Sequence, residues 1–261
     1  MGAARLRALG STLKRGTRQL WIDIPAFTAT CLVLWELLYL RVGPSGISSP
    51  LDTFVEMGQL LGSARFLENV EATGVAFLLA LAIAVGGGLA IGLFLGLVPL
   101  AGEVAAPILN ALAALPKITL YPVILLIFGL GLPARVAFGT IHGIFPIVIL
   151  TMNGIRTIRP VVRKTGRALR LTQAETIRTV LLPAALPEIF SGLRMGVGLC
   201  LFGTLIGELF ASDRGIGFVL MRDMQNQDVA GITAIAVMLF AVAIAAGIVL
   251  LQVDRRLHGE R

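Results

Sequence analysis

Long apolar stretches decide what this chain can fold into. A membrane-spanning helix needs about 20 predominantly apolar residues, and six stretches approach or exceed that length. They cover residues 24–42, 72–97, 102–131, 133–155, 186–211 and 231–253. Hydrophobic residues make up 56% of the 261-residue chain and charged residues 14%, a balance that argues against a soluble domain. The sequence therefore predicts an all-α, polytopic membrane protein with about six transmembrane helices.

Lysine and arginine indicate how these helices are oriented. Fifteen of these cations lie in residues 1–20, in residues 156–187 and in the C-terminal tail. Five lie towards the opposite ends of the helices, namely Arg41, Arg65, Arg135, Arg214 and Arg222. Because positive charge gathers on the cytoplasmic side of a membrane, we expect both termini and the 156–187 segment to be cytoplasmic.

The basic N-terminal residues could also belong to a secretory signal. The apolar run that follows them is too long for one, and it shows no convincing small-residue cleavage site. We therefore expect a cytoplasmic segment over residues 1–23 and a single transmembrane domain over residues 24–261.

Net charge and cysteine content point to no further ligand. The charge of +7 would suit a nucleic-acid-binding protein, but the basic residues stand in short loops without interleaved aromatic residues, so orientation in the lipid bilayer explains them better. No nucleic-acid partner is expected. Cys31 and Cys200 stand in apolar runs without other ligands at metal spacing. We expect free thiols packed as small hydrophobes and no metal site.

Residues 156–187, here called the basic loop, form the longest polar interruption. Arginines three or four residues apart would form one stripe on a helix; they are Arg156, Arg159, Arg163, Arg167 and Arg170. Thr172 and Glu175 fit the capping-box pattern of a helix start, which predicts a second short helix over residues 173–182. Pro183 and Pro187 belong at the start of the following helix. The pattern favours contact with a soluble partner; a solvated loop held at lipid headgroups is the alternative.

The third apolar stretch is interrupted by Pro116, Lys117 and Pro122. Two prolines so close together should kink or open a helix, which a membrane tolerates where protein or a water-filled cavity satisfies the freed carbonyls. Lys117 lies about 18 Å along its span, where a cation costs at least about 2.5 to 3.5 kcal/mol. We expect the open turn, with Tyr121, to line a translocation path in which Lys117 favours an anion. The alternative is that the break lets the ammonium reach the cytoplasmic surface.

Two more polar residues in the spans are candidates for this path. His142 stands alone in the fourth span, and a lone histidine there is more often a packing residue than a ligand. Glu208 ends the fifth span, where a carboxylate either reaches interfacial water or takes part in gating and contact with a partner.

The remaining segments predict structural features. The glycines between residues 86 and 96 favour close helix packing; they are Gly86, Gly87, Gly88, Gly92 and Gly96. Residues 50–61 carry apolar side chains in a helical period, which predicts a short interfacial helix. Residues 212–228 are expected to form a polar outer loop.

The sequence offers no catalytic constellation. It lacks a phosphate-binding Gly-x-x-x-x-Gly-Lys-Ser/Thr segment, a His-Glu-x-x-His motif and a Gly-x-Ser-x-Gly motif. We expect no catalytic residue, no cofactor in this chain and an energy source on another chain.

The basic loop resembles the cytoplasmic loop of ABC importer permeases, whose pattern is Glu-Ala-Ala, three residues, Gly, nine residues, Ile-x-Leu-Pro. When Val180, Leu182 and Pro183 are placed on the last positions, Arg170 takes the glycine position and residues 164–166 take the Glu-Ala-Ala positions. The front half therefore departs from the pattern. The segment LLPAALPEIFSGLR resembles the nitrate/sulfonate/taurine branch, as do PSGISSPLDTF, LPKITLYPVILLIFGLG and GELFASDRGIGFVL.

The resemblance implies a transport subunit in a bacterial inner membrane. Such permeases pair as dimers, dock an ATPase subunit that holds ATP and Mg, and receive a small solute from a periplasmic binding protein. The implied coupling residues are Arg163, Arg167, Arg170, Thr172, Ala174, Glu175, Val180, Leu182 and Pro183. A stand-alone secondary transporter or channel is the alternative; it predicts an internal repeat and intramembrane acid pairs, which the sequence does not show.

Overall fold

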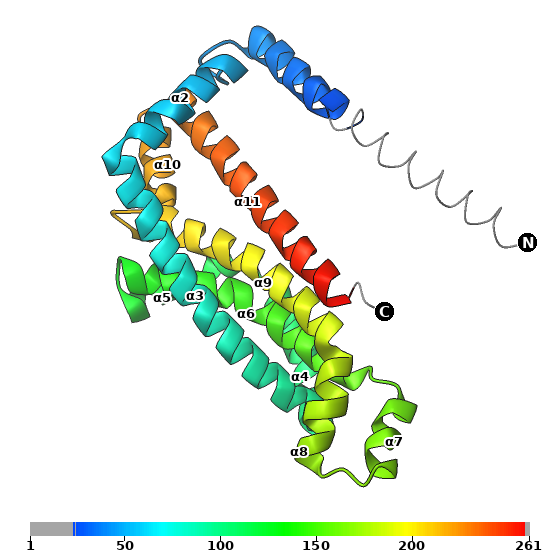
Figure 1. Ribbon diagram of the computed structural model, residues 1–261. Coiled ribbons are helices and arrows are strands. Elements are labelled where there is room, and N and C mark those ends of the chain that lie inside the picture. The colour runs from blue at the N-terminus through cyan, green and yellow to red at the C-terminus, as the bar shows by residue number, and fades with distance from the viewer. Residues whose placement is uncertain (1–22, 24, 259–261) are drawn as a thin grey trace, which may run out of the picture.

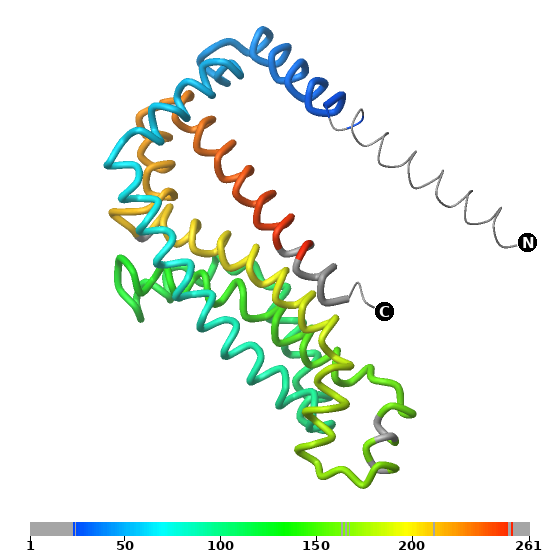
Figure 2. The backbone as a smooth tube through the Cα atoms, in the orientation of Figure 1, coloured from blue at the N-terminus to red at the C-terminus, as the bar shows by residue number. Residues whose placement is uncertain are grey.

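The structure, a computed structural model, describes residues 23 and 25–258, and all its regular elements in that part of the chain are helices. Three long helices form the centre of the bundle: α3 (Ala64–Leu97), α6 (Leu132–Arg156) and α9 (Leu182–Ala211). They lie side by side (Figures 1 and 2). The N-terminal basic segment and the last three residues lie outside the described residues.

Glycines on α3 bring its backbone against α6. A Cβ atom on Gly88 would lie 2.7 Å from Ile147, one on Gly92 would lie 2.7 Å from Thr151, and one on Gly96 would lie 2.9 Å from Ile155. Dispersion contacts drive helix packing in lipid, where the hydrophobic effect gives little help. The predicted helix–helix interface is therefore present at these three glycines; Gly86 faces open space.

Small residues play the same role between α6 and α9. Gly139 and Gly143 of α6 lie against Cys200 and Thr204, and Gly196 and Gly203 of α9 lie against Ile147 and His142. The two helices run antiparallel, so this contact fixes which residues of α6 and α9 share the same depth.

Further apolar helices flank this centre. The first runs over Pro25–Val42 and has no fully buried residue. The last is α11 (Val229–His258). Between α3 and α6, α4 (Pro99–Ala114) is followed by a 3₁₀ turn, η1 (Lys117–Leu120), and by α5 (Tyr121–Phe128). The chain bends by 87° at that break, so the predicted interruption of the third span is real. Five helices can cross a membrane by length and composition, or six with the bent pair.

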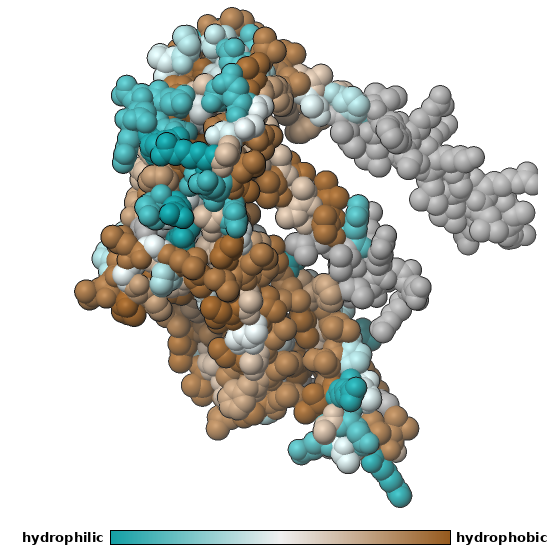
Figure 3. All heavy atoms as spheres, turned by 60° about the vertical axis from the view of Figure 1, so that its left-hand side comes forward, coloured by the Kyte–Doolittle hydropathy of each residue, from teal (hydrophilic) through white to brown (hydrophobic). Residues whose placement is uncertain are grey.

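Two polar ends enclose the apolar part of the bundle. The loop end carries α7 (Pro160–Ala168), α8 (Gln173–Thr176) and a π-helical turn, η2 (Ile177–Leu181). The far end carries α2 (Pro50–Gly62) and α10 (Ile216–Gln225). Figure 3 shows hydrophilic residues gathered at both ends and a hydrophobic surface between them. This pattern is that of a multi-pass membrane protein.

Several predicted boundaries were wrong. The predicted outer loop over residues 212–228 contains α10, because Val219 packs with Phe66 and Ile235 and so gives the helix an apolar face. Helix α3 begins eight residues earlier than predicted, at Ala64. Pro187 lies inside α9 rather than at its start. Cys31 is exposed, whereas Cys200 is buried as expected.

Candidate functional site

The basic loop forms the predicted first helix and turn, but the helix that begins at Gln173 runs into α9 without the break that was predicted before Pro183. Thr172 caps α8: its backbone N–H donates to Glu175 Oε2 at 2.8 Å, and the Glu175 N–H donates to Thr172 Oγ1 at 3.3 Å. This reciprocal pair satisfies two amides that a helix start leaves free. Ala174 lies between them and is exposed, so α8 presents an accessible surface at the loop end.

The turn between α7 and α8 depends on Arg170. Its φ is +53°, in the left-handed region that disfavours side chains with a Cβ. This is the position at which the permease pattern has glycine, so the conformation accounts for that preference. On the same turn, a Cβ atom on Gly166 would lie 2.7 Å from Thr176, so α7 and α8 pack closely.

The loop is joined firmly to the spans. Helix α8 continues through η2 into α9 without a break. Val162 of α7 and Leu181 and Leu182 of the η2–α9 junction pack against a buried cluster that includes Ile155 and Ile189. Movement of α8 would therefore be passed to α6 and α9 directly. The side chains of Arg163 and Arg167 lie outside the described part of the structure; Val180 and Pro183 are half-buried.

Lys117 lies at the bend that follows α4. Its Nζ donates to the Ala113 carbonyl at 2.9 Å and sits 5.3 Å from the centre of the Phe145 ring. The first contact satisfies a free carbonyl at a helix C-terminus and the second is a cation–π contact. Phe145 is about 16 Å by helix rise from Arg156, so the ammonium lies at mid-depth in the bundle and does not reach the loop-end surface.

Tyr121 of the bent span belongs to an aromatic cluster with residues of α6 and α9. Tyr121 packs its ring 5.4 Å from Phe138 and 5.3 Å from Phe210. Its hydroxyl is buried without a hydrogen-bond partner, so a polar contact is open at this point. Pro116 and Pro122 are exposed on the bend.

His142 is a packing residue in this conformation. It is buried between α6 and α9, with its Nδ1 2.8 Å from the Phe138 carbonyl. Its ring lies 6.1 Å from that of Phe138 and 6.0 Å from that of Phe202. The side chain lies within the contact between α6 and α9, against Gly203.

Glu208 is the centre of a buried polar cluster at the far end. The side chain is 0% exposed. Its Oε1 lies 3.5 Å from Nη1 of Arg135, and its Oε2 accepts from Thr73 Oγ1 at 2.8 Å and from the Gly217 N–H at 3.0 Å. These contacts join α3, α6, α9 and α10. One alternative from the sequence required the carboxylate to reach interfacial water. The buried carboxylate does not do so.

The loop before α10 closes over this carboxylate. The Gly215 N–H donates to Asn69 Oδ1 at 2.7 Å, and the Ile216 N–H donates to Thr73 Oγ1 at 2.8 Å. A Cβ atom on Gly215 would lie within contact of the Glu208 carboxyl carbon, and one on Gly217 would lie 2.6 Å from the Leu205 carbonyl. Only glycine leaves room for this approach, which explains the Arg-Gly-Ile-Gly sequence here.

Arg194 is a site residue that the sequence reasoning missed. It lies outside the basic loop, within α9, and is exposed. Its neighbours Gly192 and Gly196 both contact Ile147, which by helix rise is about 18 Å from Arg135 and about 14 Å from Arg156. A cation at such depth costs about 2.5 to 3.5 kcal/mol when it faces lipid. Its position far from both ends of the fifth apolar stretch is the sequence signal that could have identified it as a cation inside the membrane.

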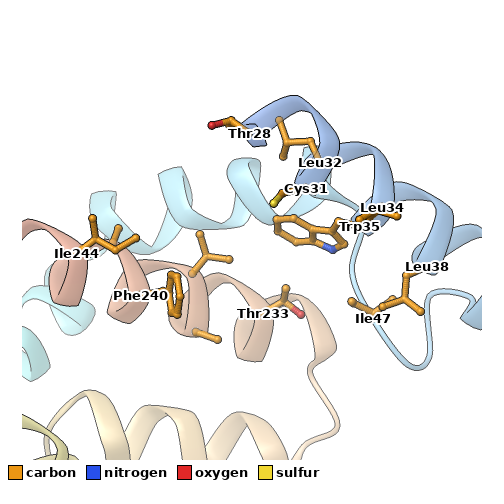
Figure 4. A pocket seen from close by; sticks show the side chains of 13 residues that line it. Thr28, Cys31, Leu32, Leu34, Trp35, Leu38, Ile47, Thr233, Phe240 and Ile244 are labelled. Atoms are coloured by element: carbon orange, nitrogen blue, oxygen red, sulfur yellow. The ribbon is translucent and has the colours of Figure 1, made fainter. Parts of the chain in front are cut away.

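An open groove on another side of the molecule has different chemistry. A groove of about 740 Å³ lies between the Pro25–Val42 helix and α11. Trp35 and Phe240 face it from opposite sides (Figure 4), and the Trp35 Nε1–H donates to the Ser48 carbonyl at 3.0 Å. The walls are almost wholly hydrocarbon, so this groove offers no group that would hold a polar solute.

Known proteins similar to this chain are transport permeases. This chain is 27% identical to the taurine transport system permease protein TauC of Escherichia coli (strain K12), over 94% of this chain and 92% of that one. It is 32% identical to the nitrate import permease protein NrtB of Leptolyngbya laminosa, over 81% and 77%. The putative aliphatic sulfonates transport permease protein SsuC of Bacillus subtilis (strain 168) is 26% identical over 83% and 81%.

Solved structures share the fold. A chain of the inward-facing MetNI methionine ABC transporter matches with a TM-score of 0.62 and 21% identity, over 77% of this chain and 98% of that one. An amino acid ABC transporter with histidines matches with a TM-score of 0.58, over 80% and 100%. The family model described as "Binding-protein-dependent transport system inner membrane component" matches residues 88–259, more than half of the chain. The chain therefore belongs to the family of inner-membrane permease components of binding-protein-dependent transport systems.

Proposed function

We propose that this permease forms, with a second copy of itself, the translocation path of an ATP-driven importer for a small oxyanion. The observation that carries the proposal is the helix pair α7–α8 at the loop end, capped by Thr172 and Glu175 and continuous with α9. A cytoplasmic ATPase docks on this pair and holds the ATP and Mg. A periplasmic binding protein delivers the solute at the far end.

The packing of the basic loop supports a coupling role. Residues of α7, η2 and α9 share one apolar cluster with Ile155 of α6. A rigid displacement of α8 would therefore move the loop ends of α6 and α9 together, which is how closure of a docked ATPase would open the path to one side and then the other. In this role the exposed Ala174 and Arg170 contact the ATPase.

The class of solute is inferred from the relatives and from charge. The relatives named above transport taurine, nitrate and aliphatic sulfonates, each of which presents charged oxygen atoms. The present chain places two cations at mid-depth, Lys117 and Arg194. Both match an anionic solute, because a cation inside the membrane is stabilised by an opposite charge.

Copurification tests the coupling role. The tagged chain is expressed with its neighbouring genes, and ATPase recovery is compared between the parent, Ala174→Asp and the far-end control Gln225→Asp. An acidic residue is favourable in the first turn of a helix, so Ala174→Asp should leave α8 folded. We expect ATPase recovery and solute uptake to fall in Ala174→Asp and to persist in Gln225→Asp. Equal recovery and uptake in the three proteins would contradict the proposal.

A further inference from the structure

A cavity in the membrane-embedded part of the bundle contains a charged side chain. It has a volume of about 250 Å³ and lies between α3, which contributes Leu81 and Val85, and α9, which contributes Ser191, Arg194 and Val197. Sites for small molecules usually measure about 300 to 1,000 Å³. The volume therefore fits a solute of a few heavy atoms and no larger ligand.

Arg194 has no internal partner that would explain its position. Among the residues that the structure describes, none makes an ion pair or hydrogen bond with its guanidinium. The nearest acidic side chain along the same helix, Glu188, points elsewhere, because six residues on a helix correspond to a turn of about 240°. Arg194 thus differs from Arg135, whose guanidinium pairs with Glu208 at 3.5 Å.

Depth and exposure together restrict what can face this arginine. The Arg194 Cα lies between the levels of Gly192 and Gly196, both in contact with Ile147 near the middle of α6. An exposed cation at that level cannot face hydrocarbon without a large cost, so it faces water, a counter-charge or a polar solute. The α3–α9 side of the bundle at this depth is therefore not covered by lipid alone.

The two mid-depth cations are not equivalent. The Lys117 ammonium already donates to the Ala113 carbonyl and lies over Phe145. All five N–H donors of Arg194 remain available, and their planar fork matches pairs of oxygen atoms on carboxylate, nitrate or sulfonate groups. Of the two, Arg194 has more free donors for a solute that presents paired oxygen atoms.

We propose that Arg194 is the anion-binding group of a mid-membrane site between α3 and α9, with Ser191 and Val197 on its wall, and that this site takes a small oxyanion. The inference rests on the proposed transport function and adds the group that recognises the charge. Ser191 Oγ now donates to the Pro187 carbonyl at 3.0 Å; rotation of this hydroxyl would provide a further donor to the anion.

Thiol labelling beside the arginine tests the site in the purified complex. Ser191→Cys is introduced after Cys31→Ala and Cys200→Ala, and its reaction rates with an anionic and a cationic methanethiosulfonate of similar size are compared. We expect reaction with both reagents and a preference for the anionic one, which Arg194→Gln lowers about tenfold. Nitrate should slow the reaction more than gluconate at equal ionic strength, because only nitrate is small enough to enter.

Matched variants keep the result interpretable. Ile83→Cys lies on the apolar groove on another side of α3 and should react slowly; Val197→Cys provides a second probe should Ser191→Cys not fold. Reaction no faster than that of Ile83→Cys, a preference that survives Arg194→Gln, or equal slowing by nitrate and gluconate would overturn the inference. ATPase copurification in the same preparation reports separately on the proposed function, so the two can fail independently.

Discussion

Arg135 and Glu208 face each other 3.5 Å apart in a cluster closed to solvent, with their side chains 8% and 0% exposed. Loss of one member of such a pair leaves the other charge buried without compensation, which costs about 3 to 5 kcal/mol. We therefore expect Glu208→Gln to lower the melting temperature of the purified permease markedly and to reduce the amount of assembled complex. Thermal unfolding in detergent or nanodiscs measures this.

Two further variants separate the charge effect from loss of a surface contact. Glu188→Gln changes an exposed carboxylate on the same helix and should leave stability unchanged. Arg135→Gln combined with Glu208→Gln should recover part of the loss, because no unpaired charge remains. A fully stable Glu208→Gln that lacks only uptake would mean that Glu208 serves the path rather than the fold.

Packing of α3 on α6 gives a second prediction. In Gly92→Ala the new Cβ would lie 2.7 Å from Thr151 and 2.9 Å from the Val148 carbonyl, so the helices must separate. We expect a loss of about 1 to 3 kcal/mol in stability. Gly86→Ala meets no atom within 4 Å and should be neutral or slightly stabilising. Equal melting temperatures for the two variants would show that this contact is not tight.

The left-handed conformation of Arg170 leads to the third prediction, which is a gain in stability rather than a loss. Arg170→Gly removes the Cβ clash of a residue at φ +53°, and this stabilises the folded loop. The greater conformational freedom of glycine in the unfolded chain offsets part of that gain. We expect a net gain of about 0.5 to 1 kcal/mol in the stability of the basic loop. Proteolysis or hydrogen exchange of the α7–α8 turn would detect it, and faster cleavage of the variant would contradict the expectation.

Lys117 should matter for uptake more than for assembly. Lys117→Met loses the contact to the Ala113 carbonyl and the cation beside Phe145, and we expect lower anion uptake with an unchanged yield of complex. Lys117→Arg keeps the charge and should retain part of the activity. Full uptake by Lys117→Met would leave this residue as a structural cap of α4.

The sequence predicted what depends on apolar length and on local capping. The bent third span, the short helix α2 and the Thr172–Glu175 capping box are all present, because each follows from residues close together in the chain. Helix α10 was missed since its apolar residues are balanced by polar ones until Phe66 and Ile235 cover them.

Contacts between residues far apart in the chain could not be predicted from the sequence. The Glu208 cluster joins Asn69, Thr73 and Arg135 to the Gly215 loop, and nothing in their spacing indicates that they meet. Arg194 was hidden for a different reason. It follows a basic segment, and only the register of α9 against Ile147 assigns it to the middle of the bundle.

Reconstituted uptake tests the central claim most directly. The permease complex is placed in liposomes with ATP on the side of the basic loop and with nitrate or taurine and the binding protein on the other side. The account predicts uptake that requires both ATP hydrolysis and the binding protein and that falls in Ala174→Asp. Uptake at the same rate without ATP, or without the ATPase subunit, would contradict the account and favour a transporter or channel that works alone.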